Sequence, residues 1–264
     1  MRNINDFMIL NLHQKLSVLI ITLNEEINLT SLLVDLDFAD EVIIIDSFST
    51  DNTKAIALSF PNVRFIENTF ENYSSQRNFA ISKATNNWIL FLDADERLTP
   101  LLKNEIIETL KTNQTYSAFL FYRKFMFKNK TLHFSGWQTD RIFRLFDKNL
   151  AKYRPEKLVH EKLEVNGKTG TFKNKLLHYS YCDFNSYKSK MVSYGKLKAQ
   201  EKFIQQLKSS FVLQFLHPTY NFLYNYLIRL GVLDGKKGVI ICYLNAYSVY
   251  VRYQELNSLW NKKK

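Results

Sequence analysis

The sequence lacks several patterns that mark common classes of protein. It contains no glycine-rich phosphate loop, neither G-x-G-x-x-G nor a Walker sequence, so it does not support a dinucleotide-binding fold or a P-loop. Its two cysteines, Cys182 and Cys242, form no metal-ligand spacing and no disulfide framework, which favours inert packing residues in a reducing compartment. No stretch reaches the roughly 20 uninterrupted apolar residues of a membrane-spanning helix.

The amino terminus also lacks the features of an export signal. Residues 1–14 are polar and have neither the long apolar core nor the small-residue cleavage site of a secretory signal. We therefore expect an N-terminal extension on a cytoplasmic protein. With 264 residues, 46% of them hydrophobic, the chain can form one large domain with an appended segment.

Positive charge is concentrated at the end of the chain. Residues 181–264 contain 13 Lys and Arg against 4 Asp and Glu, a net charge of +9, whereas residues 1–180 have a net charge of +2. The same segment is rich in aromatic and aliphatic residues, a combination that suits an anionic membrane surface. Nucleic acid is an alternative partner and a solvated basic face is another. Because the aromatics come with long aliphatic runs, we favour peripheral attachment to the inner face of the cytoplasmic membrane and no nucleic acid.

The first hundred residues alternate between strand and helix patterns. Apolar runs predict strands at Lys15–Thr22, Glu41–Asp46, Asn62–Glu67 and Trp88–Asp93, and the segments between them predict helices at Asn28–Leu36, Thr53–Phe60 and Ser75–Ala84. This order predicts an α/β fold with a parallel sheet between helices. Shorter strand patterns after Lys111 predict a mixed extension of the sheet. We place this domain at residues 15–185 and a basic, aromatic-rich helical extension at residues 186–264.

Two aspartates end the run WILFLDADER. Asp93 and Asp95 are separated by one residue, so in an extended chain their carboxylates point the same way and can share one cation. Open α/β sheets bind ligands outside the carboxyl ends of their strands, where this pair is expected. The alternative is a plain loop leading into a helix that Thr99 and Pro100 open as N-cap and first-turn residue.

Polar loops follow three of the predicted strands, and we expect them to lie side by side. Their side chains are Thr22, Asn24 and Glu25 after the first strand, Asp46, Ser47 and Asp51 after the second, and Asp93 and Asp95 after the fourth. Carboxylates, hydroxyls and amides of this kind suit a ribose and a nucleotide base. Since no glycine-rich loop can hold the phosphates, a divalent cation on Asp93 and Asp95 is the expected counter-charge for a diphosphate.

The segments SVLIITLNEEINL, DEVIIIDSFSTDNT, SSQRNFAI and NNWILFLDADE together resemble the inverting glycosyltransferases of the large family-two type, which have a Rossmann-like GT-A fold and a D-x-D motif. The resemblance extends from about Lys15 to Thr99. Three shorter motifs, VHEKL, LLHYSY and GVLDGKKG, are similar to the subgroup that adds glucose to the inner core of lipopolysaccharide. The resemblance implies inverting transfer of a sugar, glucose in that subgroup, from a UDP-linked donor to a cell-surface glycolipid.

The family pattern also implies a role for each matching residue. It places Thr22, Asn24 and Glu25 under the nucleotide, Asp46 against the uracil, Arg77 on the base or diphosphate, Asp93 on the ribose or metal, and Asp95 on a Mn²⁺ or Mg²⁺ ion. Arg77 as a surface charge and Glu25 as a first-turn acid favoured by the helix dipole are the structural alternatives.

A catalytic base is expected from the VHE motif. Glu161 is the candidate that would take the proton of the acceptor hydroxyl. Other family members carry an acidic pair here, so His160 departs from the pattern, and a purely structural pair at a strand end is the alternative. His178 is either a further metal ligand or a buried core residue, and Trp137 is either a sugar-stacking residue or a core aromatic.

Four other functions compete with glycosyl transfer. A glycoside hydrolase needs two carboxylates several ångströms apart and no metal, which adjacent aspartates fit poorly. A nucleotidyltransferase usually has a glycine-rich loop near the N-terminus. A polyprenyl-phosphate sugar transferase would have much the same catalytic domain and stays open. A non-catalytic membrane-surface protein of the same fold is disfavoured by the presence of both Asp93 and Asp95.

Overall fold

The computed structural model describes residues 14–112, 115–127, 130–137, 139–154, 162–181 and 184–263, which form two compact units. The first unit takes in the described residues up to 122 together with 141–154 and 162–176. The second unit takes in the described residues between 123 and 140 and those from 177 onward. The predicted domain limits at residues 15, 185 and 186 stay predictions.

The first unit contains every strand and helix that the sequence predicts for it. Its strands are β1 (Leu16–Thr22), β2 (Glu41–Asp46), β3 (Val63–Glu67), β4 (Trp88–Asp93), β5 (Glu96–Arg97), β8 (Arg141–Asp147), β9 (Ala151–Tyr153), β10 (Leu163–Val165) and β11 (Thr169–Thr171), and β6 (Ala118–Phe127) continues into the second unit. Its helices are α2 (Glu26–Leu33), α3 (Thr53–Leu58), α4 (Tyr73–Lys83) and α5 (Pro100–Lys111), with a 3₁₀ turn η1 (Val34–Leu36).

The main sheet confirms the predicted mixed, mainly parallel architecture. Its strands follow the order β3–β2–β1–β4–β8–β6. Strands β1 to β4 pair in parallel, whereas β8 is antiparallel to β4 and β6 is antiparallel to β8. β11 adds a short parallel pairing to β6, and β9 and β10 form a separate antiparallel pair.

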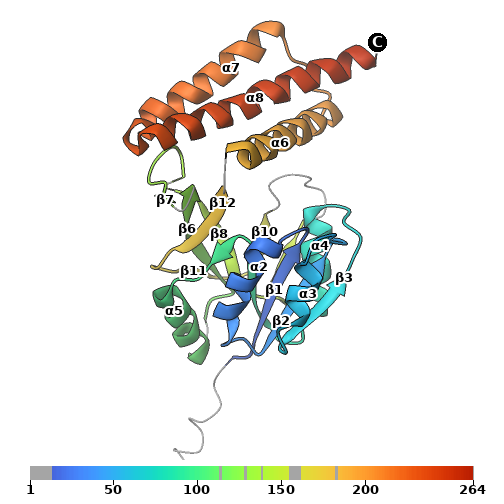
Figure 1. Ribbon diagram of the computed structural model, residues 1–264, viewed down its shortest axis with the longest axis vertical. Helices are drawn as coiled ribbons and strands as arrows, with labels where there is room; N and C mark the ends of the chain where they lie inside the picture. Colours follow the sequence, from blue (N-terminus) through green and yellow to red (C-terminus); the bar gives the residue numbers. More distant parts are fainter. Residues whose placement is uncertain are drawn as a thin grey trace, which may run out of the picture. The chain divides into compact units, whose positions relative to one another are not determined.

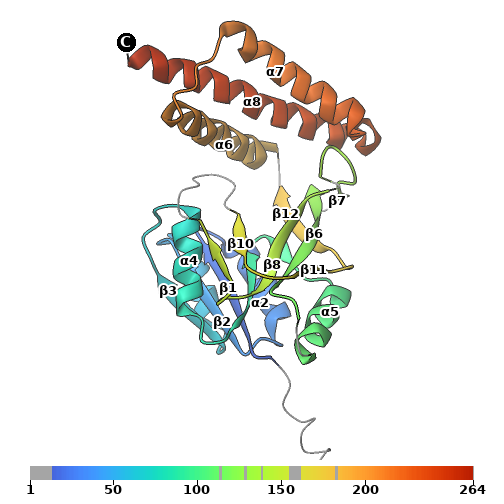
Figure 2. The ribbon, with the colours of Figure 1, turned by 180° about the vertical axis from the view of Figure 1, so that it is seen from behind.

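Helices cover both faces of this sheet (Figures 1 and 2). Successive residues of a buried strand point to opposite faces. Val18 and Ile20 of β1 therefore pack in the core with α2, α3 and α5, while Leu19 packs in the core with α4, β9 and β10. Strands β1, β2 and β4 are almost fully buried between these two apolar cores. Burial of each aliphatic side chain contributes about 1.5–3 kcal/mol to the free energy of folding.

Local capping explains where two helices begin. Thr99 caps α5 through a hydrogen bond from Leu102 N–H to its Oγ1 at 3.2 Å, and Pro100 is the first helical residue, as the sequence predicts. α4 begins at Tyr73 rather than at the predicted Ser75. The reason is Asn72, whose Oδ1 accepts a hydrogen bond from Ser75 N–H at 2.9 Å.

The second unit is mostly helical. It contains the end of β6, β7 (Lys130–Thr131), β12 (Leu176–Tyr181), α6 (Phe184–Ile204), α7 (Phe211–Leu223), a π-helical turn η2 (Tyr224–Ile228), a 3₁₀ turn η3 (Gly231–Asp234) and α8 (Lys236–Lys262). α6 and α7 both pack on α8, and the predicted C-terminal helical region is confirmed. Among the described residues, none of the helices combines the length and the apolarity needed to span a bilayer.

The GVLDGKKG motif has a structural role in this unit. Asp234 is buried and accepts hydrogen bonds from His133 N–H at 3.0 Å, Phe134 N–H at 2.9 Å and the Ser135 hydroxyl at 3.2 Å. A Cβ at Gly238 would lie 1.8 Å from the Gly231 carbonyl oxygen, so the start of α8 can approach η3 only with glycine there. The motif therefore ties the β7 region to the α7–α8 connection.

Candidate functional site

The carboxyl ends of three neighbouring strands meet at one edge of the sheet. Thr22 at the end of β1 pairs in register with Asp46 of β2, and Ile21 pairs with Asp93 of β4. The chain runs outward from β1 through β2 to β3 on one side, and then returns to place β4 on the other side. Ligands of open α/β sheets bind at such a switch point. The predicted adjacency of the three strand ends is thus present.

Asp46 ties the loop after β2 to the end of β1. The side chain is almost fully buried, and its Oδ1 accepts hydrogen bonds from the Thr22 hydroxyl at 2.7 Å and the Ser49 hydroxyl at 2.6 Å. Its Oδ2 accepts a third hydrogen bond from Ser49 N–H at 2.7 Å. Hydrogen bonds to a charged group are stronger than those between neutral groups, so this carboxylate fixes the local backbone.

The loop after β1 is hydrogen-bonded to the loop after β2. Asn24 adopts a left-handed conformation, with φ of 56°, which asparagine tolerates better than most residues. Its N–H donates to the Ser49 hydroxyl at 2.7 Å, and its Oδ1 accepts from Thr50 N–H at 2.8 Å. Glu25 N–H donates to the Thr53 hydroxyl at 2.8 Å. The two loops therefore form one hydrogen-bonded rim.

Replacing Asp46 with alanine should loosen this rim. The change removes three charge-assisted hydrogen bonds and leaves the Thr22 hydroxyl without this acceptor, so we expect the free energy of unfolding to fall by about 1–3 kcal/mol. Chemical denaturation measures that change. Asp37→Ala is the control, because it removes an exposed carboxylate that pairs with Lys103 at the surface, and it should cost much less stability than Asp46→Ala. Equal effects of the two substitutions would contradict the structural role of Asp46.

Asp93 lies between two arginines. Its Oδ1 accepts a hydrogen bond from Arg77 Nη2 at 2.9 Å, and its Oδ2 pairs with Arg144 Nη2. The same Arg144 nitrogen donates to Glu96 Oε1 at 2.7 Å, while Glu96 Oε2 accepts from Asp93 N–H at 3.1 Å. Two carboxylates and two guanidinium groups thus form one continuous network at the end of β4.

Burial gives this network its energetic weight. The side chains of Arg144 and Glu96 are fully buried, and Asp93 is partly exposed. Burial by itself lowers the pKa of the Arg144 guanidinium, but the charges of Asp93 and Glu96 outweigh it and raise that pKa above its ordinary value. Arg144 is therefore a permanent cation beside the carboxylates of Asp93 and Glu96.

Arg77 presents its guanidinium group to aromatic rings as well as to Asp93. Its Cζ lies 4.9 Å from the ring centroid of Phe91 and 5.5 Å from that of Tyr153. Arg77 is 7% exposed, so the alternative of a surface charge does not apply. Burial raises the pKa of the Tyr153 hydroxyl, which stays protonated beside this cation.

Asp95 follows in the turn between β4 and β5 and is half-buried. The described residues contain no group of three or more His, Cys, Asp or Glu side chains that could hold a metal ion by themselves. Both oxygens of Asp93 already face guanidinium groups. Magnesium in phosphate-handling sites usually takes one or two carboxylates and completes its shell with substrate oxygens and water. The carboxylates at this edge fit a cation that a diphosphate would also bind, and the metal roles of Asp93 and Asp95 both stay predictions.

The structure describes only two of the remaining predicted residues. Glu161 and His160 lie outside the described residues. His178 is buried in the second unit, and its ring centroid lies 4.8 Å from that of Phe125. The ring centroid of Trp137 lies 4.2 Å from the same Phe125 centroid. These contacts agree with the core alternatives for both residues.

Sequence reasoning missed two members of the Asp93 network. Glu96 is part of the DADER segment and was available as a candidate, but nothing local distinguishes it from a loop residue. Arg144 lies 51 positions from Asp93, on β8. Only the antiparallel pairing of β8 with β4 brings it to the site.

Comparisons with known proteins relate this chain to glycosyltransferases of family 2. The sequence profile described as "Glycosyl transferase family 2" matches residues 17–173. "Lipopolysaccharide core biosynthesis glycosyltransferase LpsC" of Rhizobium meliloti (strain 1021) is 27% identical over 250 residues, which cover 90% of this chain and 93% of the relative. "Uncharacterized glycosyltransferase RP128" of Rickettsia prowazekii (strain Madrid E) is 26% identical over 262 residues, 93% of this chain and 88% of the relative. Among solved structures, S. aureus TarS 1-349 in complex with UDP aligns with a TM-score of 0.47 and 16% identity, over 95% of this chain and 92% of that one.

Proposed function

This chain belongs to glycosyl transferase family 2, and from that premise we propose that it transfers glucose from a UDP-linked donor, with inversion, to a saccharide of a cell-surface glycolipid such as the lipopolysaccharide core. The observation that carries the proposal is the meeting of Thr22, Asp46 and Asp93 at adjacent strand ends, inside the residues that the family profile matches. The glycolipid acceptor is suggested by the similarity to LpsC.

The donor would lie along the three strand ends. The rim formed by Asn24, Asp46 and Ser49 would meet the base and ribose, and Arg77 would present its guanidinium to the base or the diphosphate. Because the hydrogen bonds of Asp46 and Asn24 already fix this rim, the donor would bind a surface that needs little rearrangement.

A divalent cation, Mn²⁺ or Mg²⁺, would be held by Asp95 and the donor diphosphate. When bound, it would neutralise the negative charge that develops on the leaving diphosphate. Arg144 and Arg77 hold the side chain of Asp93 at the end of β4, two positions before Asp95. Such a preorganised arrangement of charges lowers the barrier more than flexible groups in water can.

Glu161 is our candidate for the base that takes the proton of the attacking hydroxyl. Removing that proton allows one in-line displacement, which inverts the anomeric centre. Glu161→Gln keeps the size of the side chain but cannot accept the proton, so we expect the transfer rate to fall by about a hundredfold or more. UDP binding should stay unchanged. A variant with full activity would exclude Glu161 as the base.

A transfer assay tests the proposed reaction directly. Purified protein is incubated with UDP-glucose, Mn²⁺ and a heptose-containing core acceptor, and the product is identified by mass and anomeric configuration. Glucose joined to the acceptor with inversion supports the proposal. Transfer to a polyprenyl phosphate instead would favour the closest rival reaction, and hydrolysis alone would contradict the proposal.

We also propose that the basic second unit holds the enzyme at the cytoplasmic face of the membrane, near a lipid-linked acceptor. The net charge of +9 in residues 181–264 supports this attachment. Sedimentation with anionic vesicles at low ionic strength tests it, and protein that stays in the supernatant would contradict it.

A further inference from the structure

α7 and η2 expose apolar side chains and bury a polar one, which is the reverse of a helix that packs on a protein core. Residues 211–228 contain no Asp, Glu, Lys or Arg, yet their apolar side chains face outward. The exposed ones that follow a helical spacing are Val212, Leu216, Tyr220, Leu223 and Leu227. Positions three and four apart share one face of a helix, so these five form a continuous stripe, which we call the α7 stripe.

The polar residues of the same helix face its neighbour α8. Gln214 is buried and its Oε1 accepts a hydrogen bond from Asn257 Nδ2 at 3.1 Å. His217 Nδ1 is hydrogen-bonded to the hydroxyl of Tyr253. These residues interrupt the apolar run in the sequence, but in the structure they hydrogen-bond to α8. The one buried residue of α7 is therefore polar, whereas the α7 stripe is exposed.

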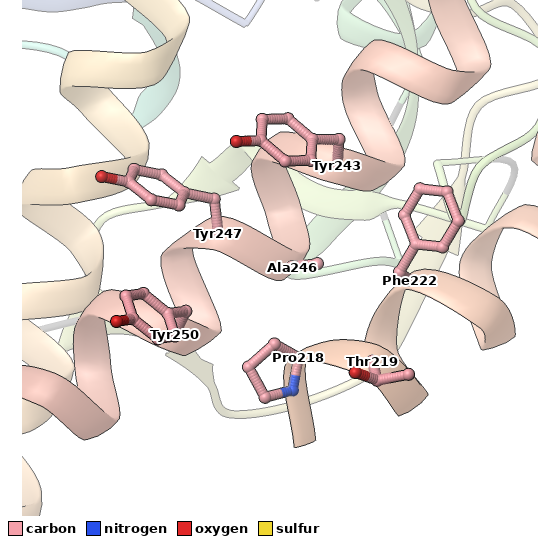
Figure 3. Close-up of a pocket in the computed structure, with 7 residues that line it drawn as sticks. All are labelled: Pro218, Thr219, Phe222, Tyr243, Ala246, Tyr247 and Tyr250. Carbon is pink, nitrogen blue, oxygen red and sulfur yellow. The ribbon is translucent and has the colours of Figure 1, made fainter. Parts of the chain in front are cut away.

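An open apolar concavity of about 310 Å³ lies beside this face, between α7 and α8 (Figure 3). Phe222 of α7 lies on one side and the rings of Tyr243, Tyr247 and Tyr250 of α8 lie on the other. The ring planes of Tyr243 and Tyr247 are 15° apart with centroids at 6.2 Å. Tyrosines with an apolar body and a polar tip are enriched where membranes meet water.

The charges around the α7 stripe suit an anionic surface. Residues 201–255 contain six Lys and Arg and three acidic residues, Glu201, Asp234 and Glu255. Asp234 is buried, and its carboxylate accepts hydrogen bonds from the backbone N–H groups of His133 and Phe134. The Lys188 ammonium lies 5.7 Å from the ring centroid of Tyr247, at the groove. An anionic bilayer would meet apolar side chains and cations together.

We propose that α7 and η2 lie in the plane of an anionic bilayer, with the α7 stripe and the neighbouring tyrosine-lined groove in contact with the lipid acyl chains. This inference rests on the membrane attachment proposed above and specifies how the protein attaches. An apolar face inserts into the bilayer, and the basic residues attract the protein to the anionic lipid. Attachment by charge alone would be lost in high salt, whereas insertion leaves a salt-resistant fraction.

The test measures sedimentation with vesicles of equal parts phosphatidylglycerol and phosphatidylethanolamine at about 1 M NaCl, where the screening length is about 3 Å. We expect the wild type to keep a bound fraction. The double variant Leu216→Gln/Leu227→Gln should lower the high-salt partition coefficient about tenfold or more, because two apolar side chains no longer enter the lipid. Glutamine is a good helix former, so α7 and its helical signal in circular dichroism should persist.

Two control variants separate insertion from other causes. Leu58→Gln/Leu101→Gln changes two equally exposed leucines of α3 and α5, which are 59% and 67% exposed against 58% and 53% for Leu216 and Leu227, and should leave binding unchanged. Lys196→Gln/Lys236→Gln should weaken binding at low salt and leave the high-salt fraction intact. As an independent readout, the emission of Tyr220→Trp, after subtraction of the wild-type emission, should shift to the blue when vesicles are added at high salt.

Three results would overturn the inference. Complete release of the wild type at about 1 M NaCl, after binding at low salt, would show attachment by charge alone and leave the donor-site proposal untouched. Absence of binding at low salt would remove the membrane attachment as well, while UDP binding would still report on the donor site. A change in the molar mass of the α7 double variant by light scattering, with vesicle binding unaltered, would identify a second copy of the chain as the cover of the stripe.

Discussion

Arg144→Met is expected to lower the free energy of unfolding of the first unit by about 3–5 kcal/mol, because it removes the guanidinium group that pairs with the buried carboxylate of Glu96. Methionine fills much of the volume of the arginine side chain, so the loss reflects charge more than packing. Asp93 loses one of its two guanidinium partners in the same step. We therefore expect weaker donor binding in whatever fraction of the variant folds. Chemical denaturation and UDP calorimetry measure the two effects.

Arg154→Met provides the matched control. It removes an arginine that pairs with Glu164 at the surface, with both side chains exposed, and surface pairs contribute about 0–1 kcal/mol. A double variant, Arg144→Met/Glu96→Gln, should recover part of the lost stability because no buried charge remains unpaired. If Arg144→Met cost no more than Arg154→Met, the buried network would not stabilise the fold.

Asp95→Asn is expected to lower the rate of sugar transfer by about a hundredfold or more, because it removes the charge that would hold the cation at the diphosphate. The substitution keeps the shape of a half-buried turn residue, so the free energy of unfolding should change by only about 0.5 kcal/mol. Activity should fall at every Mn²⁺ concentration. Rates are measured with UDP-glucose, and stability by thermal unfolding.

Asp93→Asn is the informative comparison because it changes the other aspartate of the same motif. It removes the negative charge between Arg77 and Arg144, so it should lower both activity and the free energy of unfolding, the latter by about 1–3 kcal/mol. The two substitutions are thus expected to differ in how much they lower the free energy of unfolding. Equal stability losses for the two variants would contradict the structural role assigned to Asp93.

Strands β1, β2 and β4 of the first unit could be predicted from the sequence because they are almost fully buried. β2 and β4 occupy Glu41–Asp46 and Trp88–Asp93, as predicted, since each is a continuous apolar run that ends in a charged residue. Helix ends were less accurate. The predicted helix at Asn28–Leu36 is α2 from Glu26 followed by a separate 3₁₀ turn, and the Glu25 carbonyl oxygen that accepts from Leu29 N–H sets that start. No local pattern marks such a hydrogen bond.

The site residues at the ends of the parallel strands could be predicted from the sequence. Those brought in by the pairing of β4 with β8, which is far along the chain, could not. Thr22, Asp46 and Asp93 follow directly from the parallel order of β1, β2 and β4. Arg144 is 48 positions from Glu96, and its place at the site follows from an antiparallel neighbour that periodicity cannot assign.

The reversed polarity of α7 was also hidden in the sequence. Periodicity predicts which residues share a face but assumes that the apolar face turns inward. In α7 the apolar face turns outward and Gln214 turns inward, because Asn257 of α8 offers that amide a hydrogen-bond partner. Only the packing of α7 on α8 identifies which face is exposed.

The central claim is a metal-dependent nucleotide site at the ends of β1, β2 and β4, and calorimetric titration of UDP tests it most directly. Wild type and Asp95→Ala are each titrated with and without Mn²⁺. We predict that the wild type binds UDP only when Mn²⁺ is present and that Asp95→Ala loses this binding. Failure of the wild type to bind UDP under any condition, or equal binding with and without metal, would contradict the account.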